Sequence, residues 1–331
     1  MKKIALIFIS FLFSISIASQ EKKYDRVLKL MGTRFDLSVV ANSEKEANIY
    51  MDIAVAEMNR IESVISSWDK DSETSKINQN AGVKPVEVSN ELFELIKRAI
   101  QISNITDGAF DISYASMDKI WKFDGTITEM PSAKAIKKSV EKVGYKNIIL
   151  NEKEQTVFLK LEGMKIGFGA IGKGYAADKA KKILQEKGVK AGLMNASGDL
   201  NCWGKQPNGE SWKVGITNPL NKNKMYSWFD IDNQAVVTSG NYEKFIHFNG
   251  KKYSHIINPK TGYPANGIVS ATVFAPKAEL ADALATSIFV MGTEVGIDLV
   301  NQLKGVECII IDAKNKVHTS KNIALKNINK L

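Results

Sequence analysis

The stretch Lys165-Ile-Gly-Phe-Gly-Ala-Ile-Gly-Lys-Gly-Tyr-Ala-Ala-Asp178 constrains the fold more than any other part of the chain. A short apolar run leads into a glycine-rich turn, and we expect an amphipathic helix to begin near Gly172. Glycine adopts positive φ at no steric cost and lets a ligand approach the backbone closely. The four glycines expected to act in this way are Gly167, Gly169, Gly172 and Gly174. The unpaired N–H groups at the helix start then face the turn, which predicts an anion site suited to a phosphate.

Neither of two common phosphate-binding motifs accounts for this stretch. Gly167 to Gly172 matches G-x-G-x-x-G, but a Rossmann unit requires an acidic residue at the end of a strand about 20 residues later. The corresponding strand is Ala191-Gly-Leu-Met-Asn195, which has no acid. A Walker motif fails because Lys173 is followed by glycine rather than Ser or Thr. The stretch therefore predicts either phosphate binding by another architecture or a turn that needs glycine only for packing.

The first nineteen residues have the features of a secretory signal peptide. Lys2 and Lys3 form a basic start, residues 4–17 form an apolar run, and Ser16-Ile17-Ala18 resembles a small-residue cleavage site. The run is shorter than the roughly 20 residues that a membrane span needs. We therefore expect an exported protein, located in the periplasm or at the periplasmic face of the inner membrane. No cysteine lies in or near the segment, so a lipid anchor is not expected.

Composition and charge describe an ordinary globular protein. The 331 residues are 44% hydrophobic and 24% charged. Without the two lysines of residues 1–19 the formal charge changes from +9 to +7. The basic residues are spread along the chain, which favours a solvated surface over nucleic-acid binding, although a mild positive field would attract a phosphorylated substrate. Cys202 and Cys308 are the only cysteines, and sequence alone leaves open whether they pair.

Runs of strands and runs of helices are interleaved without steady βαβ alternation. Helices are expected from the Ser43-Glu44-Lys45-Glu46 capping box to about Trp68, after Ser89, over 131–143, from Gly172 to Lys187, and over 278–291. A polar loop is expected from Asp69 to Gly82. Hairpins are expected for 27–31 with 35–40, for 148–150 with 157–161, and around Asn249-Gly250. This pattern predicts an α+β fold, a single compact domain of mixed or antiparallel sheets packed with helices.

Two further groups of residues suggest chemistry. Asp282 and Thr286 are four apart on a predicted helix and so lie on one face, where their oxygens would suit Mg²⁺. A polar pair packed against a loop is the alternative. His255 precedes a Pro-Lys-Thr-Gly turn and could serve as a general base or a phosphate contact. A hydrogen-bonded histidine without a catalytic role is the alternative there.

Seven segments, taken together, resemble the FAD:protein FMN transferases of the ApbE flavin transferase family. The segments are Met31-Gly-Thr33, Asp107-Gly-Ala-Phe-Asp111, Gly169-Ala-Ile-Gly-Lys-Gly-Tyr-Ala-Ala-Asp178, Asn195-Ala-Ser-Gly-Asp199, Thr238-Ser-Gly-Asn-Tyr242, His255-Ile-Ile-Asn-Pro-Lys-Thr-Gly262 and Ala281-Asp-Ala-Leu-Ala-Thr286. Their order and spacing are similar over about residues 27–310. The resemblance implies a T-fold-like, ApbE-type domain over residues 20–331. It also implies binding of FAD and Mg²⁺-dependent transfer of FMN to a threonine hydroxyl of an acceptor protein, with release of AMP.

The resemblance also implies roles for particular residues. Magnesium would be held by Asp282, Thr286 and backbone oxygens of Ala170 and Ala285. The residues that would bind FAD are Met31, Trp68, Ala109, Phe110, Asp111, Gly167, Lys173 and Ile256. His255 and Asp282 would be catalytic, with His255 as the base or orienter for the attacking hydroxyl. Asp178 would have a structural role or would support the ligand-binding residues without touching the ligand.

Some features depart from the family pattern or leave alternatives open. Gly167 stands where many relatives carry an aspartate, and Ile112-Ser-Tyr-Ala-Ser-Met117 lacks the usual Pro-Thr-Val-Gly-Pro form. A Mg²⁺-dependent FAD pyrophosphatase that yields FMN and AMP, or a flavin-binding protein without turnover, are the alternatives to the transferase. Acceptors would be flavoproteins with a Ser/Thr-Gly-Ala/Ser-Thr motif, such as extracytoplasmic domains of membrane redox complexes. This chain has no such motif, which argues against self-modification.

Overall fold

A computed structural model describes residues 21–124, 126–127, 129–218, 221–242, 244–248 and 250–323. Its main element is an eight-stranded sheet. In spatial order its strands are β1 (Lys22–Leu30), β2 (Thr33–Ala41), β6 (Gly192–Ala196), β7 (Asp199–Trp203), β10 (Ala235–Gly240), β13 (Ile268–Ala275), β14 (Glu307–Asp312) and β15 (Val317–Thr319). The strand pairs described are antiparallel, so the α+β prediction with antiparallel sheets is confirmed.

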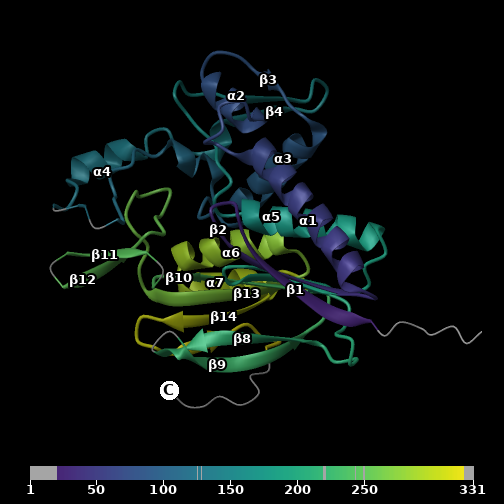
Figure 1. The fold of residues 1–331 in the computed structure, drawn as a ribbon. Helices are drawn as coiled ribbons and strands as arrows, with labels where there is room; N and C mark the ends of the chain where they lie inside the picture. Colours follow the sequence, from purple (N-terminus) through teal and green to yellow (C-terminus); the bar gives the residue numbers. More distant parts are fainter. Residues whose placement is uncertain are drawn as a thin grey trace, which may run out of the picture.

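Helices cover one face of this sheet and a strand ribbon covers the other (Figure 1). The helices are α1 (Glu44–Ile65), α2 (Glu73–Gln79), α3 (Asn90–Ile105), α4 (Ala133–Ser139), α5 (Gly172–Glu186), α6 (Ala278–Met291) and α7 (Thr293–Gln302), with short 3₁₀ turns at Ile112–Ser116 and Tyr145–Asn147. The ribbon consists of β8 (Trp212–Asn218) and β9 (Asn221–Ile231). The smaller sheets are β3 (Val86–Glu87), β5 (Thr156–Leu159) and β4 (Ile148–Asn151), and the hairpin β11 (Phe245–Phe248) with β12 (Lys251–Ser254).

Two hydrophobic cores follow from these layers. The larger core joins the helices to the sheet and contains Phe35, Ile61, Leu92 and Phe289, each almost fully buried. The smaller core lies between the sheet and the β8–β9 ribbon and contains Trp212. Alternating side chains of a strand point to opposite faces, so each strand of the central sheet can supply both cores. A third cluster around Trp121 joins α4 to the β11–β12 hairpin.

The two cysteines belong to different cores. Cys202 packs in the core under the ribbon and Cys308 in the core under the helices. Both are free and buried. The sheet separates them, which answers the question that the sequence left open.

Several local predictions are confirmed and some are wrong. Ser89 accepts a hydrogen bond from the Leu92 amide at 3.3 Å and caps α3, and α6 has the expected bounds. The loop expected from Asp69 to Gly82 contains α2, which has too few turns to show an apolar period. The helix expected over 131–143 is shorter, since α4 ends at Ser139. Residues 1–19 and Asn249 lie outside the described residues, so the signal peptide and the division into one domain over 20–331 stay predictions.

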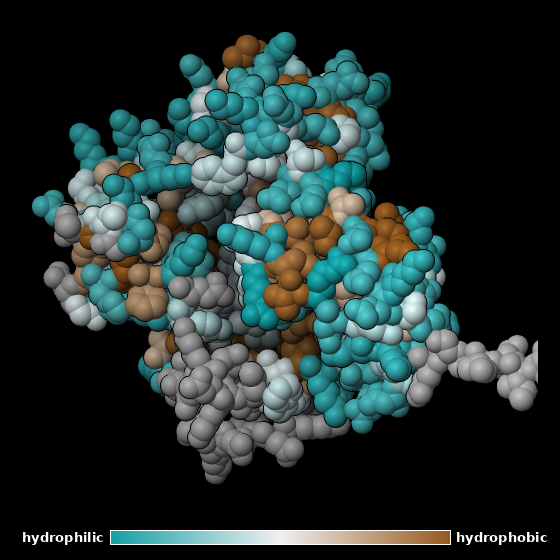
Figure 2. Space-filling view, viewed as in Figure 1, coloured by the Kyte–Doolittle hydropathy of each residue, from teal (hydrophilic) through white to brown (hydrophobic). Residues whose placement is uncertain are grey.

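The surface is hollowed between the lobe that carries α4 with the β11–β12 hairpin and the body that carries α5 and α6 (Figure 2). Within the described parts of the chain, no helix has both the length and the apolar composition to span a bilayer.

Candidate active site

The glycine-rich stretch ends where α5 begins, at Gly172, as expected. The prediction of positive φ is wrong, because none of its four glycines has a left-handed backbone. Two of them instead have close neighbours. A Cβ at Gly172 would lie 2.8 Å from Ile65 Cδ1, and a Cβ at Gly174 would lie 2.3 Å from the Ala278 carbonyl oxygen. The packing interpretation therefore holds at Gly174, where the neighbour is backbone that cannot turn aside, and this contact brings α5 against α6.

This contact places the Asp282 carboxylate at the start of α5. The Gly174 amide donates to Asp282 Oδ2 at 3.3 Å, a long hydrogen bond. Ile171, the N-cap residue of α5, has no side chain that can cap the helix. The Asp282 carboxylate accepts from an amide of the first turn instead. Burial raises the pKa of Asp282, while the Lys173 ammonium and the Gly174 amide act in the opposite direction. A buried carboxylate that accepts one long hydrogen bond is stabilised in its charged form when a cation binds its oxygens.

Thr286 lies one turn after Asp282 on α6, as the spacing predicts. Its Oγ1 is 3.3 Å from Ser239 Oγ on β10. Two hydroxyls thus meet between α6 and β10, one helical turn along α6 from Asp282. All three offer hard oxygen atoms.

Lys173 extends from the first turn of α5 and forms an ion pair with Asp199. Asp199 is the first residue of β7, and its side chain is 8% exposed whereas that of Lys173 is 31% exposed. The ammonium therefore stands at the helix N-terminus, where it adds to the positive end of the helix dipole. An anion that approaches the start of α5 is therefore attracted by the Lys173 ammonium and by the helix dipole.

Several predicted FAD-binding residues surround this helix start. Met31 has φ +47° in the β1–β2 turn, and its Cε would be 3.9 Å from a Cβ at Gly172. A Cβ at Gly167 would meet Ala115 at 3.1 Å and Ser67 Oγ at 3.6 Å, so this position adjoins the residue before Trp68. Trp68 is 80% exposed, with Lys119 Nζ 4.3 Å from its ring centroid. Its indole is available for stacking on a planar ring.

The Ala109-Phe110-Asp111 segment is buried beside this region. Asp111 accepts hydrogen bonds from the Ser113 amide at 2.7 Å, the Ser113 hydroxyl at 2.6 Å and the Tyr145 amide at 2.8 Å. Burial raises the pKa of Asp111, and these three donors partly offset that effect. The carboxylate therefore anchors its loop, and its role in FAD binding stays a prediction.

The His255 loop approaches the same segment. Lys260 pairs with Asp107 at 2.5 Å, which links the loop after β12 to the loop before Ala109. His255 lies just after β12, and its Nδ1 is 3.1 Å from the Lys244 carbonyl oxygen. A carbonyl oxygen only accepts, so Nδ1 carries the hydrogen and Nε2 is the atom that can take a proton. Ile256 is buried in the main core.

The predicted metal ligands include two backbone oxygens. Ala170 precedes α5 and is partly buried, whereas Ala285 lies inside α6, where its carbonyl is already the acceptor of a helical hydrogen bond. Among the residues described, no three His, Cys, Asp or Glu side chains are grouped to hold a metal ion. Asp282, Thr286 and backbone oxygens nevertheless form a donor set that fits Mg²⁺, which takes few protein carboxylates and keeps water or phosphate oxygens.

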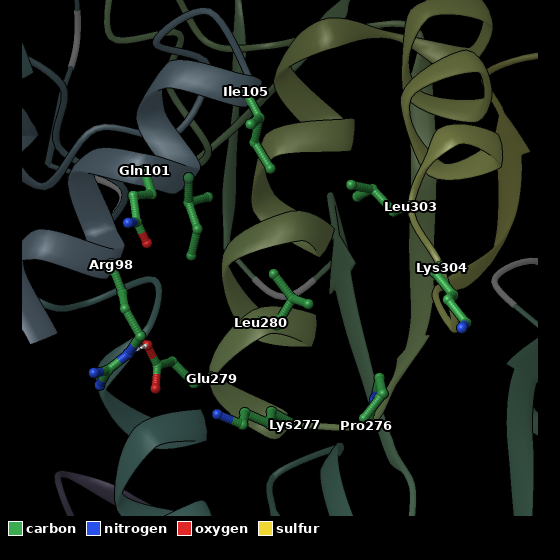
Figure 3. Close-up of a pocket in the computed structure, with 10 residues that line it drawn as sticks. Arg98, Gln101, Ile105, Pro276, Lys277, Glu279, Leu280, Leu303 and Lys304 are labelled. Atoms are coloured by element: carbon green, nitrogen blue, oxygen red, sulfur yellow. Dashed lines mark hydrogen bonds and ion pairs between the residues drawn. The ribbon is translucent and has the colours of Figure 1, made fainter.

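Two cavities lie away from these residues. One of about 450 Å³ lies between α3 and α6, and it includes Ile105, Leu280 and the Arg98–Glu279 ion pair at 2.6 Å (Figure 3). The other, of about 480 Å³, shares that ion pair. Neither is lined by a predicted site residue in the part of the chain that the structure describes. Asp178 borders the second cavity and accepts from the Ala278 amide at 3.0 Å and the Glu279 amide at 2.9 Å, so it caps α6 and has the structural role expected.

Two residues of the site had no role in the sequence analysis. Ser239 and Asp199 belong to quoted segments, but their contacts with Thr286 and Lys173 join residues far apart in the chain. In the sequence, each is a polar residue beside a predicted strand. That position does not predict which distant residue its side chain will contact.

The chain has an antiparallel α+β fold in which the buried Asp282 carboxylate of α6 meets the first turn of α5. The chain belongs to the ApbE family, whose model matches residues 31–310. A protein of Treponema pallidum named FAD:protein FMN transferase is 30% identical over 318 residues, which cover 91% of this chain and 88% of that protein. One of Klebsiella pneumoniae with the same name is 29% identical over 300 residues, covering 90% and 92%. The crystal structure of the ApbE protein from Thermotoga maritima has a TM-score of 0.81 and 31% identity, and the match covers 91% of this chain and 97% of that one.

Proposed function

We propose that this protein transfers FMN from FAD to a threonine hydroxyl of an acceptor protein and releases AMP. The observation that carries the proposal is the meeting of Asp282 with the first turn of α5, at 3.3 Å from the Gly174 amide, beside Lys173. A pyrophosphate needs cationic and N–H partners for its oxygens and a divalent cation for its charge. The relatives named FAD:protein FMN transferase supply the reaction to which such a site is suited.

Each side chain of the site would have its own role in binding FAD or in the transfer. Lys173 and the α5 N-terminus would hold phosphate oxygens, and Trp68 would stack on a ring of FAD. Nε2 of His255 would take the proton of the threonine hydroxyl. The threonine oxygen forms a bond to the FMN phosphorus, the bond from that phosphorus to the bridging oxygen breaks, and AMP leaves.

A magnesium ion at Asp282 and Thr286 would neutralise charge that develops on the pyrophosphate. The protein's own contribution is to present these two oxygens from one face of α6, with Ser239 Oγ 3.3 Å from Thr286 Oγ1. Ala170 and Ala285 would complete the set with backbone oxygens.

We further propose that the protein acts after export. The support is the basic and apolar pattern of residues 1–19. Acceptors would then be extracytoplasmic flavoprotein domains that carry the Ser/Thr-Gly-Ala/Ser-Thr motif.

Incubation of the purified protein with FAD, Mg²⁺ and an acceptor domain that carries this motif tests the proposal. The expected result is a covalent mass increase of one FMN on the acceptor and an equal amount of AMP. An acceptor with the motif threonine replaced by valine should gain no mass. Release of AMP without any mass increase would instead identify an FAD pyrophosphatase, and binding of FAD without AMP would identify a flavin-binding protein.

A further inference from the structure

Lys173 pairs with one buried carboxylate, and the residue after it in the chain binds another. It forms an ion pair with Asp199 at the start of β7. The next residue along the chain, Gly174, donates its amide to Asp282 at 3.3 Å. Both Asp199 and Asp282 are less than 10% exposed, so each is a strong partner for a cation.

Asp199 is held in place by the turn between β6 and β7. Ser197 and Gly198 have φ of +54° and +105°, and the Gly198 amide donates to Asn195 Oδ1 at 2.7 Å. Ser197 Oγ is 2.5 Å from Thr33 Oγ1 and donates to the Arg34 carbonyl at 3.0 Å, which ties this turn to the β1–β2 turn. Because the turn is bonded on both sides, the Asp199 carboxylate has a defined position.

A lysine at position 173 would oppose the binding of a cation at Asp282. An ammonium and a divalent cation compete for the same carboxylate, since two like charges close together repel each other. Lys173 has a long flexible side chain anchored one residue from the amide that binds Asp282. A side chain that starts one residue from this amide can turn toward Asp282 when the Asp199 carboxylate does not hold it.

We propose that Asp199 is a positioning residue that keeps the Lys173 ammonium away from Asp282 and so leaves the Asp282 carboxylate available to a divalent cation. The inference rests on the metal site of the proposed function and deepens it. Asp199 then acts on metal binding only through Lys173. It also holds the ammonium at the N-terminus of α5, where the phosphate oxygens of FAD would arrive.

A double-mutant cycle on metal binding tests this role without turnover. The variants are Asp199→Asn, Lys173→Met and the double variant, with Glu152→Gln as control because it removes the carboxylate of a remote ion pair with Lys97. Binding of Mn²⁺ alone is measured by electron paramagnetic resonance on the purified proteins, and Mg²⁺ by competition. Melting curves confirm that each variant is folded.

Asp199→Asn should weaken Mn²⁺ binding by about 10- to 100-fold, the range seen when a residue that supports a metal ligand is removed. Lys173→Met should bind Mn²⁺ at least as tightly as the parent, and adding Asp199→Asn to it should change the affinity by less than about threefold. An equal loss in both backgrounds, or no loss in Asp199→Asn, overturns the inference.

Two further outcomes are also decisive. If Asp199→Asn does not fold, the comparison of Lys173→Met with the double variant still applies, and a difference of about tenfold or more between them overturns the inference. A parent protein that binds no Mn²⁺ overturns it as well. The expected cycle together with no FMN transfer to an acceptor would contradict the transferase alone and leave the role of Asp199 standing.

Discussion

Gly174 and Asp282 join the first turn of α5 to α6 through one backbone-to-carboxylate hydrogen bond of 3.3 Å. The bond exists because Gly174 has no side chain, so α5 approaches the Ala278 backbone at the start of α6. Lys173 is the residue before Gly174, so the same approach makes the lysine side chain start one residue from the amide that binds the carboxylate. Gly174 thus allows α5 and α6 to pack closely, and this packing brings Asp282 to the first turn of α5.

Replacing Asp282 with alanine should reduce Mg²⁺-dependent FMN transfer to the background rate, because the variant lacks the carboxylate proposed to bind the ion. The fold should remain, since the carboxylate makes one long hydrogen bond and burial opposes its charge. Transfer assays at increasing Mg²⁺ and a melting curve measure the two effects. Asp298→Ala on α7 is the control and should keep full activity. Full activity of Asp282→Ala would rule out the metal assignment.

Replacing His255 with alanine should slow transfer by about 10²- to 10⁴-fold at saturating FAD, as expected for loss of a general base. The dissociation constant for FAD, measured by flavin fluorescence, should change little. His247→Ala on β11 is the matched control, because that ring packs on Phe245 at 5.3 Å between centroids. An unchanged transfer rate in His255→Ala would remove the histidine from the mechanism.

Replacing Gly174 with alanine should lower the free energy of unfolding by about 1–3 kcal/mol or more, the cost of overpacking a closely packed contact. A Cβ there would be 2.3 Å from the Ala278 carbonyl oxygen. Gly169→Ala is the control, since a Cβ at that position meets no atom within 4 Å. Urea unfolding of both variants gives the comparison. Equal stability of the two variants would show that α5 and α6 can separate at no cost.

Replacing Glu91 with glutamine should destabilise the protein at neutral pH and much less at pH 2. Burial opposes the charge of Glu91, but hydrogen bonds from Arg60, Lys179 and Tyr175 outweigh it and lower its pKa to about 2. A lowered folded pKa stabilises the protein above the unfolded pKa of about 4.3, and this contribution is lost as the pH falls toward 2. The expected loss at pH 7 is about 2–3 kcal/mol.

Urea unfolding from pH 7 to pH 2 measures this contribution. Glu94→Gln, also on α3, is the control and should change the free energy of unfolding by less than about 0.5 kcal/mol at any pH. A difference between the parent and Glu91→Gln that does not change with pH would show that the carboxylate stabilises the protein by packing rather than by its charge.

Local signals in the sequence were sufficient for most elements near the site. The Ser89 cap, the start of α5 at Gly172 and the bounds of α6 depend on neighbouring residues, since capping and apolar periodicity act within one or two turns. The same signals failed at α2, whose seven residues are too few for a period. They also failed for the glycines, because a glycine in a sequence does not show whether φ or a close neighbour requires it.

The sequence by itself determined most of the secondary structure, the α+β class and the short-range pair Asp282 and Thr286, because these depend on residues within a few positions of one another. Only the tertiary structure decided which side chains meet at the start of α5. Asp199 pairs with Lys173 from 26 positions away, and Gly174 meets Asp282 from 108 positions away. It also separated Cys202 from Cys308 by a sheet. Such contacts follow from how strands pair and helices pack, and no local pattern encodes the partner.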